Sequence, residues 1–111
     1  MTPAVHADRL RGALWGMFVG DALAVPAHWY CYIEHSFPAV LYLAARYPDD
    51  FEVALVANTN VGGDNCHRGA VLGALLGAAL GYRAIPDRLI HGLRSRAELS
   101  EEIECFIARF A

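Results

Sequence analysis

The chain has 111 residues and a net charge of −3, with 12 acidic and 9 basic residues. This length fits one domain, so residues 1–111 are predicted to form a single helical domain. The absence of a basic block argues against nucleic acid as a partner. Hydrophobic residues make up 56% of the chain before its 10 glycines are counted. A small monomer cannot easily hide so much apolar material, which leaves a membrane protein, an oligomer or part of a larger domain.

The membrane explanation fails on the length of the apolar runs. A spanning helix needs about 20 consecutive apolar residues, and the longest run, 69–82, is about two-thirds of that. The N-terminus lacks the basic head and apolar core of a signal peptide. We therefore predict no membrane association and a cytoplasmic location. The three widely spaced cysteines do not suggest a disulfide framework, and Cys31 and Cys105 are expected to be buried and reduced.

Taken in chain order, almost every segment has the apolar spacing of a helix. Ser36 can cap the second helix with Pro38 in its first turn, Asp49 or Asp50 can cap the third, and Gly81 can terminate the fourth. No strand alternation of useful length occurs, so the predicted fold class is all-α with five to six helices. The predicted helices are 8–24, 36–47, 51–58, 67–80, 87–93 and 100–110.

Glycines recur every four residues in the first and fourth predicted helices. They are Gly12, Gly16 and Gly20 in the first, and Gly69, Gly73, Gly77 and Gly81 along the fourth. A glycine inside a helix costs roughly 0.5–1 kcal/mol relative to alanine, so this spacing indicates that two backbones approach closely. If the two helices run antiparallel, the end of the first meets the start of the fourth. Asp21 and His28 would then lie near Asp64, Cys66 and His67.

The segment "VGGDNCHRG" places several ligand-type side chains at the start of the fourth predicted helix. A structural interpretation is open, because Asp64 and Asn65 are favoured helix caps and the two glycines before them suit a turn. The alternative is half of a metal site. Carboxylates suit hard cations, whereas thiolate and imidazole suit zinc, so ligand type leaves the metal open. The helix-start amides favour an anion such as phosphate, which Arg68 would hold unless it is solvated.

Two stretches resemble the ADP-ribosylglycohydrolase family. The first, "GALWGMFVGDALAVPAHW", is similar to the family's opening helix, which ends in Gly-Asp-Ala-Leu-Gly-x-Pro-x-Glu. The second, "ALVANTNVGGDNCHRGAVLGALLGAALGYRAIP", is similar to its C-terminal signature, Gly-Gly-Asp-Thr-Asp-Thr followed by a small-residue helix and an Ile-Pro turn. The resemblance covers about residues 10–30 and 36–93 and implies an orthogonal all-α bundle.

The resemblance also implies a hydrolase that uses Mg²⁺ or Mn²⁺ to cleave an N- or O-glycosidic linkage of ADP-ribose. Its partner would be ADP-ribose or an ADP-ribosylated substrate. By position, Asp64 matches the first signature aspartate, Cys66 the second, and His67 the threonine that follows. His28 stands where the family has a ligand glutamate, so these four are the predicted metal ligands, with Zn²⁺ a further option. The predicted catalytic residues are Asp64 and His67, and the predicted substrate-binding residues are Gly62, Gly63, Asn65 and Arg68.

The chain departs from the family pattern in two ways. Only Asp64 keeps a carboxylate among the matched ligands, and the central region with its Thr/Ser-Asp-Asp motif is missing. This indicates a shortened family member whose bare apolar faces explain the composition. The rival interpretation is a non-catalytic helical module that forms homo-oligomers through those faces. A cysteine hydrolase built on Cys66 and His67 is disfavoured, because adjacent residues on a helix do not face each other.

Overall fold

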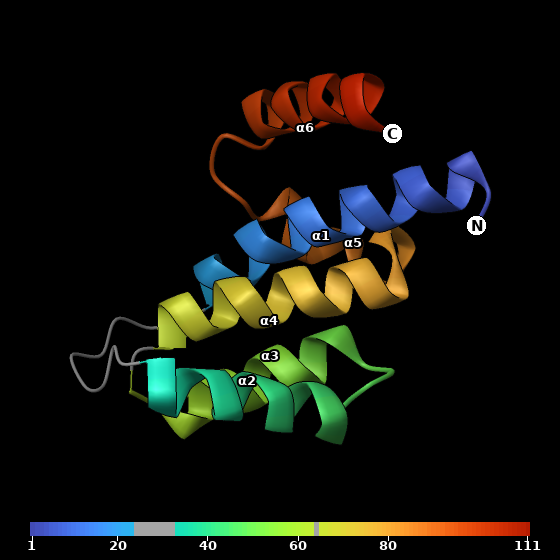
Figure 1. The fold of residues 1–111 in the computed structure, drawn as a ribbon. Coiled ribbons are helices and arrows are strands. Elements are labelled where there is room, and N and C mark those ends of the chain that lie inside the picture. Colours follow the sequence, from blue (N-terminus) through green and yellow to red (C-terminus); the bar gives the residue numbers. More distant parts are fainter. Residues whose placement is uncertain (24–32, 64) are drawn as a thin grey trace.

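The structure is a computed structural model that describes residues 1–23, 33–63 and 65–111 (Figure 1). These residues form six α-helices and one 3-10 helix without any strand, which confirms the all-α prediction. None of the described helices combines the length and apolar character needed to cross a bilayer. The elements are α1 (Pro3–Leu23), α2 (Ile33–Arg46), α3 (Phe51–Val61), α4 (Asn65–Leu80), η1 (Tyr82–Ala84), α5 (Asp87–His91) and α6 (Arg96–Phe110).

The first two helices begin earlier than the sequence predicted. α1 begins before Asp8, because the hydroxyl of Thr2 accepts a hydrogen bond from the amide of Val5 at 3.2 Å and caps the helix there. α2 begins before Ser36, so the predicted cap is wrong and Pro38 lies inside the helix rather than in its first turn. Pro38 cannot donate the hydrogen bond that its position in the helix calls for.

Two predicted helix ends are confirmed. The amide of Val53 donates to Asp50 Oδ1 at 3.1 Å, so Asp50 is the cap of α3. Gly81 ends α4 with a φ of 89°, a value that glycine adopts without strain. The last helix begins at Arg96 rather than near Ser100, so α6 is a full turn longer than predicted.

The helices stack in layers with α1 and α4 in the middle (Figure 1). α6 lies against the outer side of α1, whereas α2 and α3 pack on the opposite side of α4. Each layer contributes to one buried core, which includes Trp15 and Val19 from α1, Val40 and Leu43 from α2, Phe51 and Leu55 from α3, Leu72 and Leu76 from α4, and Ile103 and Ile107 from α6.

α1 and α4 run antiparallel and touch through their glycines, as predicted. Three glycines of α1 face three glycines of α4. A Cβ added at any of the six would lie only 1.9–2.4 Å from the carbonyl oxygen of the glycine opposite. The obstacle is backbone, so no side-chain rearrangement could relieve the clash. The end of α1 therefore meets the start of α4. The facing pairs are Gly12–Gly77, Gly16–Gly73 and Gly20–Gly69.

α6 is attached to α1 by two buried isoleucines, Ile103 and Ile107, and by one ion pair. Arg11 donates from Nε to Glu104 Oε1 at 2.7 Å and from Nη2 to Oε2 at 3.0 Å. This bidentate hydrogen bond lowers the pKa of Glu104 below its ordinary value. Cys105 is exposed and free, so the prediction of a buried thiol is wrong there; the helix turns positions 103 and 107 toward α1 instead. Cys31 lies outside the described residues.

We expect the attachment of α6 to weaken in acid. The pKa of Glu104 is lower in the folded protein than in the unfolded chain. The ion pair with Arg11 therefore contributes fully to stability above the ordinary carboxyl pKa of about 4.3, and this contribution is lost as pH falls through the folded pKa. Amide hydrogen exchange in α6, corrected for its intrinsic pH dependence, should accelerate up to about fivefold, the limit for an exposed pair. Glu104→Gln should show the faster exchange already at neutral pH. Equal protection of α6 on both sides of this pH window would contradict the expectation.

Candidate functional site

The turn between α3 and α4 is built from two glycines, as the sequence predicted. Gly62 and Gly63 have φ values of 77° and 69°, which residues with a side chain rarely adopt. The amide of Gly62 donates to the carbonyl of Thr59 at 3.2 Å, and the amide of Asn65 donates to that of Gly63 at 2.9 Å. α4 therefore begins at Asn65, before the predicted His67.

A buried polar network ties this turn to both helices. The side chains of Asn58 and Arg68 are only 1% and 6% exposed. Arg68 donates from Nε to Asn58 Oδ1 at 3.0 Å and from Nη2 to the carbonyl of Gly62. Asn58 Nδ2 donates to the carbonyl of Asn65 at 2.9 Å. Arg68 is thus not solvated, and its predicted contact with a phosphate stays a prediction.

Asn65 is directed inward, with an exposure of 2%. Its Nδ2 donates to the carbonyl of Thr59 at 3.3 Å, so this side chain also links α4 to α3. Its Oδ1 is buried and has no hydrogen-bond partner in the described part of the chain. A buried acceptor of this kind can take one further donor. The predicted role of Asn65 in substrate binding is untested.

The two predicted ligands within α4 differ in exposure. Cys66 is half-buried and His67 is exposed, and as successive helix residues they project in different directions. Within the described residues, no three Cys, His, Asp or Glu side chains are placed to hold a metal ion. Asp64 and His28 lie outside the described residues, and the side chain of Asp21 is not described either. The four-ligand site therefore remains a prediction.

The end of α1 does reach this turn. A Cβ on Gly20 would lie 2.0 Å from the carbonyl oxygen of Gly69, and a Cβ on Gly69 would lie 3.2 Å from Asn58 Nδ2. The C-terminal end of α1, the first turns of α4 and the Asn58 network thus meet at one place, as the antiparallel arrangement predicted.

Sequence reasoning missed Asn58, although its position carries a signal. Phe51, Ala54 and Leu55 form the buried stripe of α3, and Asn58 continues it at helical spacing. A polar residue on an apolar stripe must find partners inside the protein, because an unpaired buried amide is costly. Asn58 finds these partners in Arg68, which donates to its Oδ1, and in the carbonyl of Asn65, which accepts from its Nδ2.

A model of the ADP-ribosylglycohydrolase family matches residues 30–111. This range includes the second stretch on which the resemblance rests and extends it to residue 111, whereas residues 10–29 lie outside it. No curated protein and no solved structure matches the chain.

Proposed function

Because the chain belongs to the ADP-ribosylglycohydrolase family, we propose that it is a hydrolase that cleaves a glycosidic linkage of ADP-ribose. The observation that carries the proposal is the antiparallel contact of α1 with α4. It sets Gly20, which precedes Asp21 in the sequence, against Gly69 in the second turn of α4. This contact supports the proposal because it brings the C-terminal part of α1 to the first turns of α4, where the proposed site residues lie in the sequence.

The proposed substrate is ADP-ribose bound to a protein side chain or a similar acceptor. The backbone at Gly62 and Gly63 carries no side chain that would keep a ligand away. Amides in the first turn of α4 favour the negative charge of a diphosphate. Arg68 and Asn58 hold the turn through the carbonyl of Gly62 and through each other. His67 is exposed on α4, where its imidazole can exchange a proton with a substrate.

The donor types also bear on the metal. Among the proposed ligands, Asp64 supplies oxygen, whereas Cys66, His67 and His28 supply sulfur or nitrogen. By donor type alone, this set suits a softer ion such as Zn²⁺ better than the Mg²⁺ or Mn²⁺ that the resemblance implies. A bound divalent ion would supply a Lewis acid at this end of α4.

Calorimetric titration with Mg²⁺, Mn²⁺ and Zn²⁺, and then with ADP-ribose, tests this proposal. We expect one of these ions to bind, and Asp64→Asn to weaken that binding by more than about tenfold, since loss of a mere outer-shell partner already costs that much. The same variant should abolish release of ADP-ribose from an ADP-ribosylated protein. Asp49→Asn, which alters an exposed carboxylate between α2 and α3, serves as the matched control and should change neither quantity.

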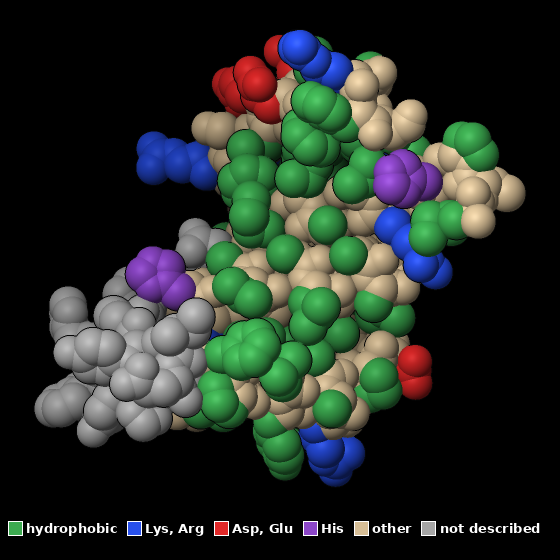
Figure 2. Space-filling model, in the orientation of Figure 1, with side chains coloured by type: hydrophobic (Ala, Val, Ile, Leu, Met, Phe, Trp, Pro, Cys, Tyr) green, Lys and Arg blue, Asp and Glu red, His purple; other side chains and the backbone are tan. Residues whose placement is uncertain are grey.

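A second candidate function is a non-catalytic helical module that self-associates. The observation that favours it is the exposed apolar surface, which Figure 2 shows over α2 and α4 and between α1 and α6. Absence of heat with every ion and with ADP-ribose, together with a stable dimer in light scattering, would support this candidate against the hydrolase. Among the helix side chains that the structure describes, the exposed large apolar residues are Val5, Phe37, Leu41, Tyr42, Val53, Val56, Val61, Val71, Leu75, Phe106 and Phe110.

A further inference from the structure

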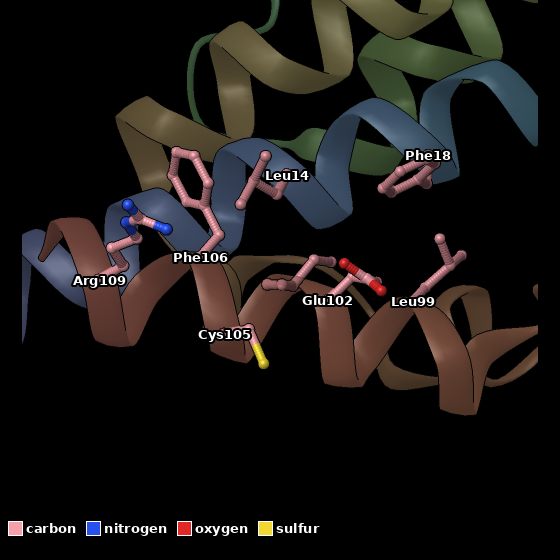
Figure 3. A pocket seen from close by; sticks show the side chains of 8 residues that line it. Leu14, Phe18, Leu99, Glu102, Cys105, Phe106 and Arg109 are labelled. Carbon is pink, nitrogen blue, oxygen red and sulfur yellow. The ribbon is translucent and has the colours of Figure 1, made fainter.

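An apolar groove of about 460 Å³ runs between α1 and α6 (Figure 3). Its lining comes from α1 through Leu14 and Phe18 and from α6 through Leu99, Ile103 and Phe106. Phe106 points toward Leu14 at one end, and Leu99 points toward Phe18 at the other (Figure 3). The groove uses none of the residues assigned to the proposed hydrolase site.

The apolar face of α6 is wider than the face that α1 covers. Ile103 and Ile107 are 4% and 5% exposed, whereas Phe106 and Phe110 are 43% and 60% exposed. The rings of Phe106 and Phe110 lie 4.8 Å apart and form a continuous apolar strip beside the groove. Apolar surface of this kind, next to a groove, is typical of a surface that another helix covers.

Two charged residues on the same side of α6 indicate which helix covers this apolar strip. Glu102 and Arg109 both line the groove, and neither forms an ion pair within the described part of the chain. They are seven residues apart, so they lie two turns apart on one face of the helix. The midpoint between them falls between Cys105 and Phe106, at the end of the exposed strip that Phe106 forms.

We propose that this groove is the interface of a homodimer in which α6 packs antiparallel against α6 of a second copy. With the twofold axis between Cys105 and Phe106, Glu102 of each copy lies opposite Arg109 of the other, so both charges are paired at once. A parallel arrangement would set Glu102 against Glu102 and Arg109 against Arg109, which is repulsive. The charges are therefore complementary to the same surface of a second copy in the antiparallel arrangement, and the apolar strip is covered in the same contact.

Reversal of one charge at a time tests the proposal. Glu102→Arg and Arg109→Glu each create two like-charge pairs in the dimer, so each variant alone should dimerise at least about tenfold more weakly than the wild type. An equimolar mixture of the two variants should regain wild-type affinity, because the heterodimer pairs every charge with its opposite. Analytical ultracentrifugation over a range of concentrations measures all three dissociation constants.

Glu101→Arg is the matched control, because Glu101 is exposed on α6 but does not line the groove. It should leave the dimer unchanged, and circular dichroism should give the same helix content for every variant. The proposal is overturned by a wild type that stays monomeric throughout the micromolar range, by a dimer that tolerates either reversal, or by a mixture no tighter than its components. A monomer that binds an apolar dye in the groove would likewise overturn it. These outcomes do not depend on whether the chain hydrolyses ADP-ribose.

Discussion

Gly73→Ala is expected to destabilise the protein by at least about 3 kcal/mol, the upper range for overpacked sites. The added Cβ would lie 2.0 Å from the carbonyl oxygen of Gly16 and 3.3 Å from the Cα of Gly20. Both contacts are with the backbone of α1, so α1 and α4 must move apart and uncover the core between them. In an ordinary helix interior the same substitution stabilises by roughly 0.5–1 kcal/mol. Whether Gly73→Ala lowers or raises the free energy of unfolding therefore tests the backbone contact between α1 and α4.

Thermal unfolding followed by circular dichroism measures this effect. For a domain of this size the Tm should fall by more than about 10 °C. Gly92→Ala provides a comparison, because Gly92 ends α5 with a φ of −77° and its added Cβ would meet only Arg88 and Leu89 carbonyl oxygens, at 3.3 and 3.8 Å. Its stability should change by less than about 1 kcal/mol. A Gly73→Ala protein as stable as the wild type would mean that the two helices are not in backbone contact.

Asn58→Leu is expected to cost about 2–4 kcal/mol of stability. Leucine has the same branched shape as asparagine and is somewhat larger, so the substitution removes polar partners without opening a cavity. Arg68 Nε would lose its acceptor while the guanidinium stays buried, and the carbonyl of Asn65 would lose its donor. Removing one partner from a buried charged network costs more than the net value of the hydrogen bond, because the remaining groups stay desolvated.

Asn60→Leu is the control on the same helix. Asn60 is exposed, so this substitution should change stability by no more than about 0.5 kcal/mol. Urea unfolding gives both free energies through the shift of the midpoint at constant slope. If the two leucine variants proved equally stable, the Asn58 network would contribute nothing to the junction of α3 and α4.

Local chemistry explains why much of the fold could be predicted. Asp50 caps α3 and Gly81 terminates α4, and both act through hydrogen bonds or dihedral angles within a few residues. The sequence predicts the starts of α2 and α6 too late, because Ser36 and Ser100 are good residues for a helix start in isolation but the chain is already helical before them. Capping preference is worth only about 1 kcal/mol, which packing of the neighbouring turns readily exceeds.

Part of the candidate site could be predicted from the sequence in the same way. The turn at Gly62 and Gly63 and the start of α4 nearby follow from residue types that are specific to tight turns and helix starts. The burial of Arg68 and its attachment to Asn58 could not be predicted in the same way. A charged side chain is usually solvated, and only the meeting of α1, α3 and α4 around this one removes it from water.

The glycine spacing along residues 12–20 and 69–77 by itself determined that α1 and α4 pack face to face, because a periodic absence of side chains has no other stabilising use in a helix. Only the tertiary structure decided which way polar and apolar residues beyond that contact would turn: Arg68 into a buried network, Phe106 and Phe110 toward solvent beside an open groove. Periodicity specifies the face along which a helix packs, whereas burial depends on which other helices are present to cover the rest of its surface.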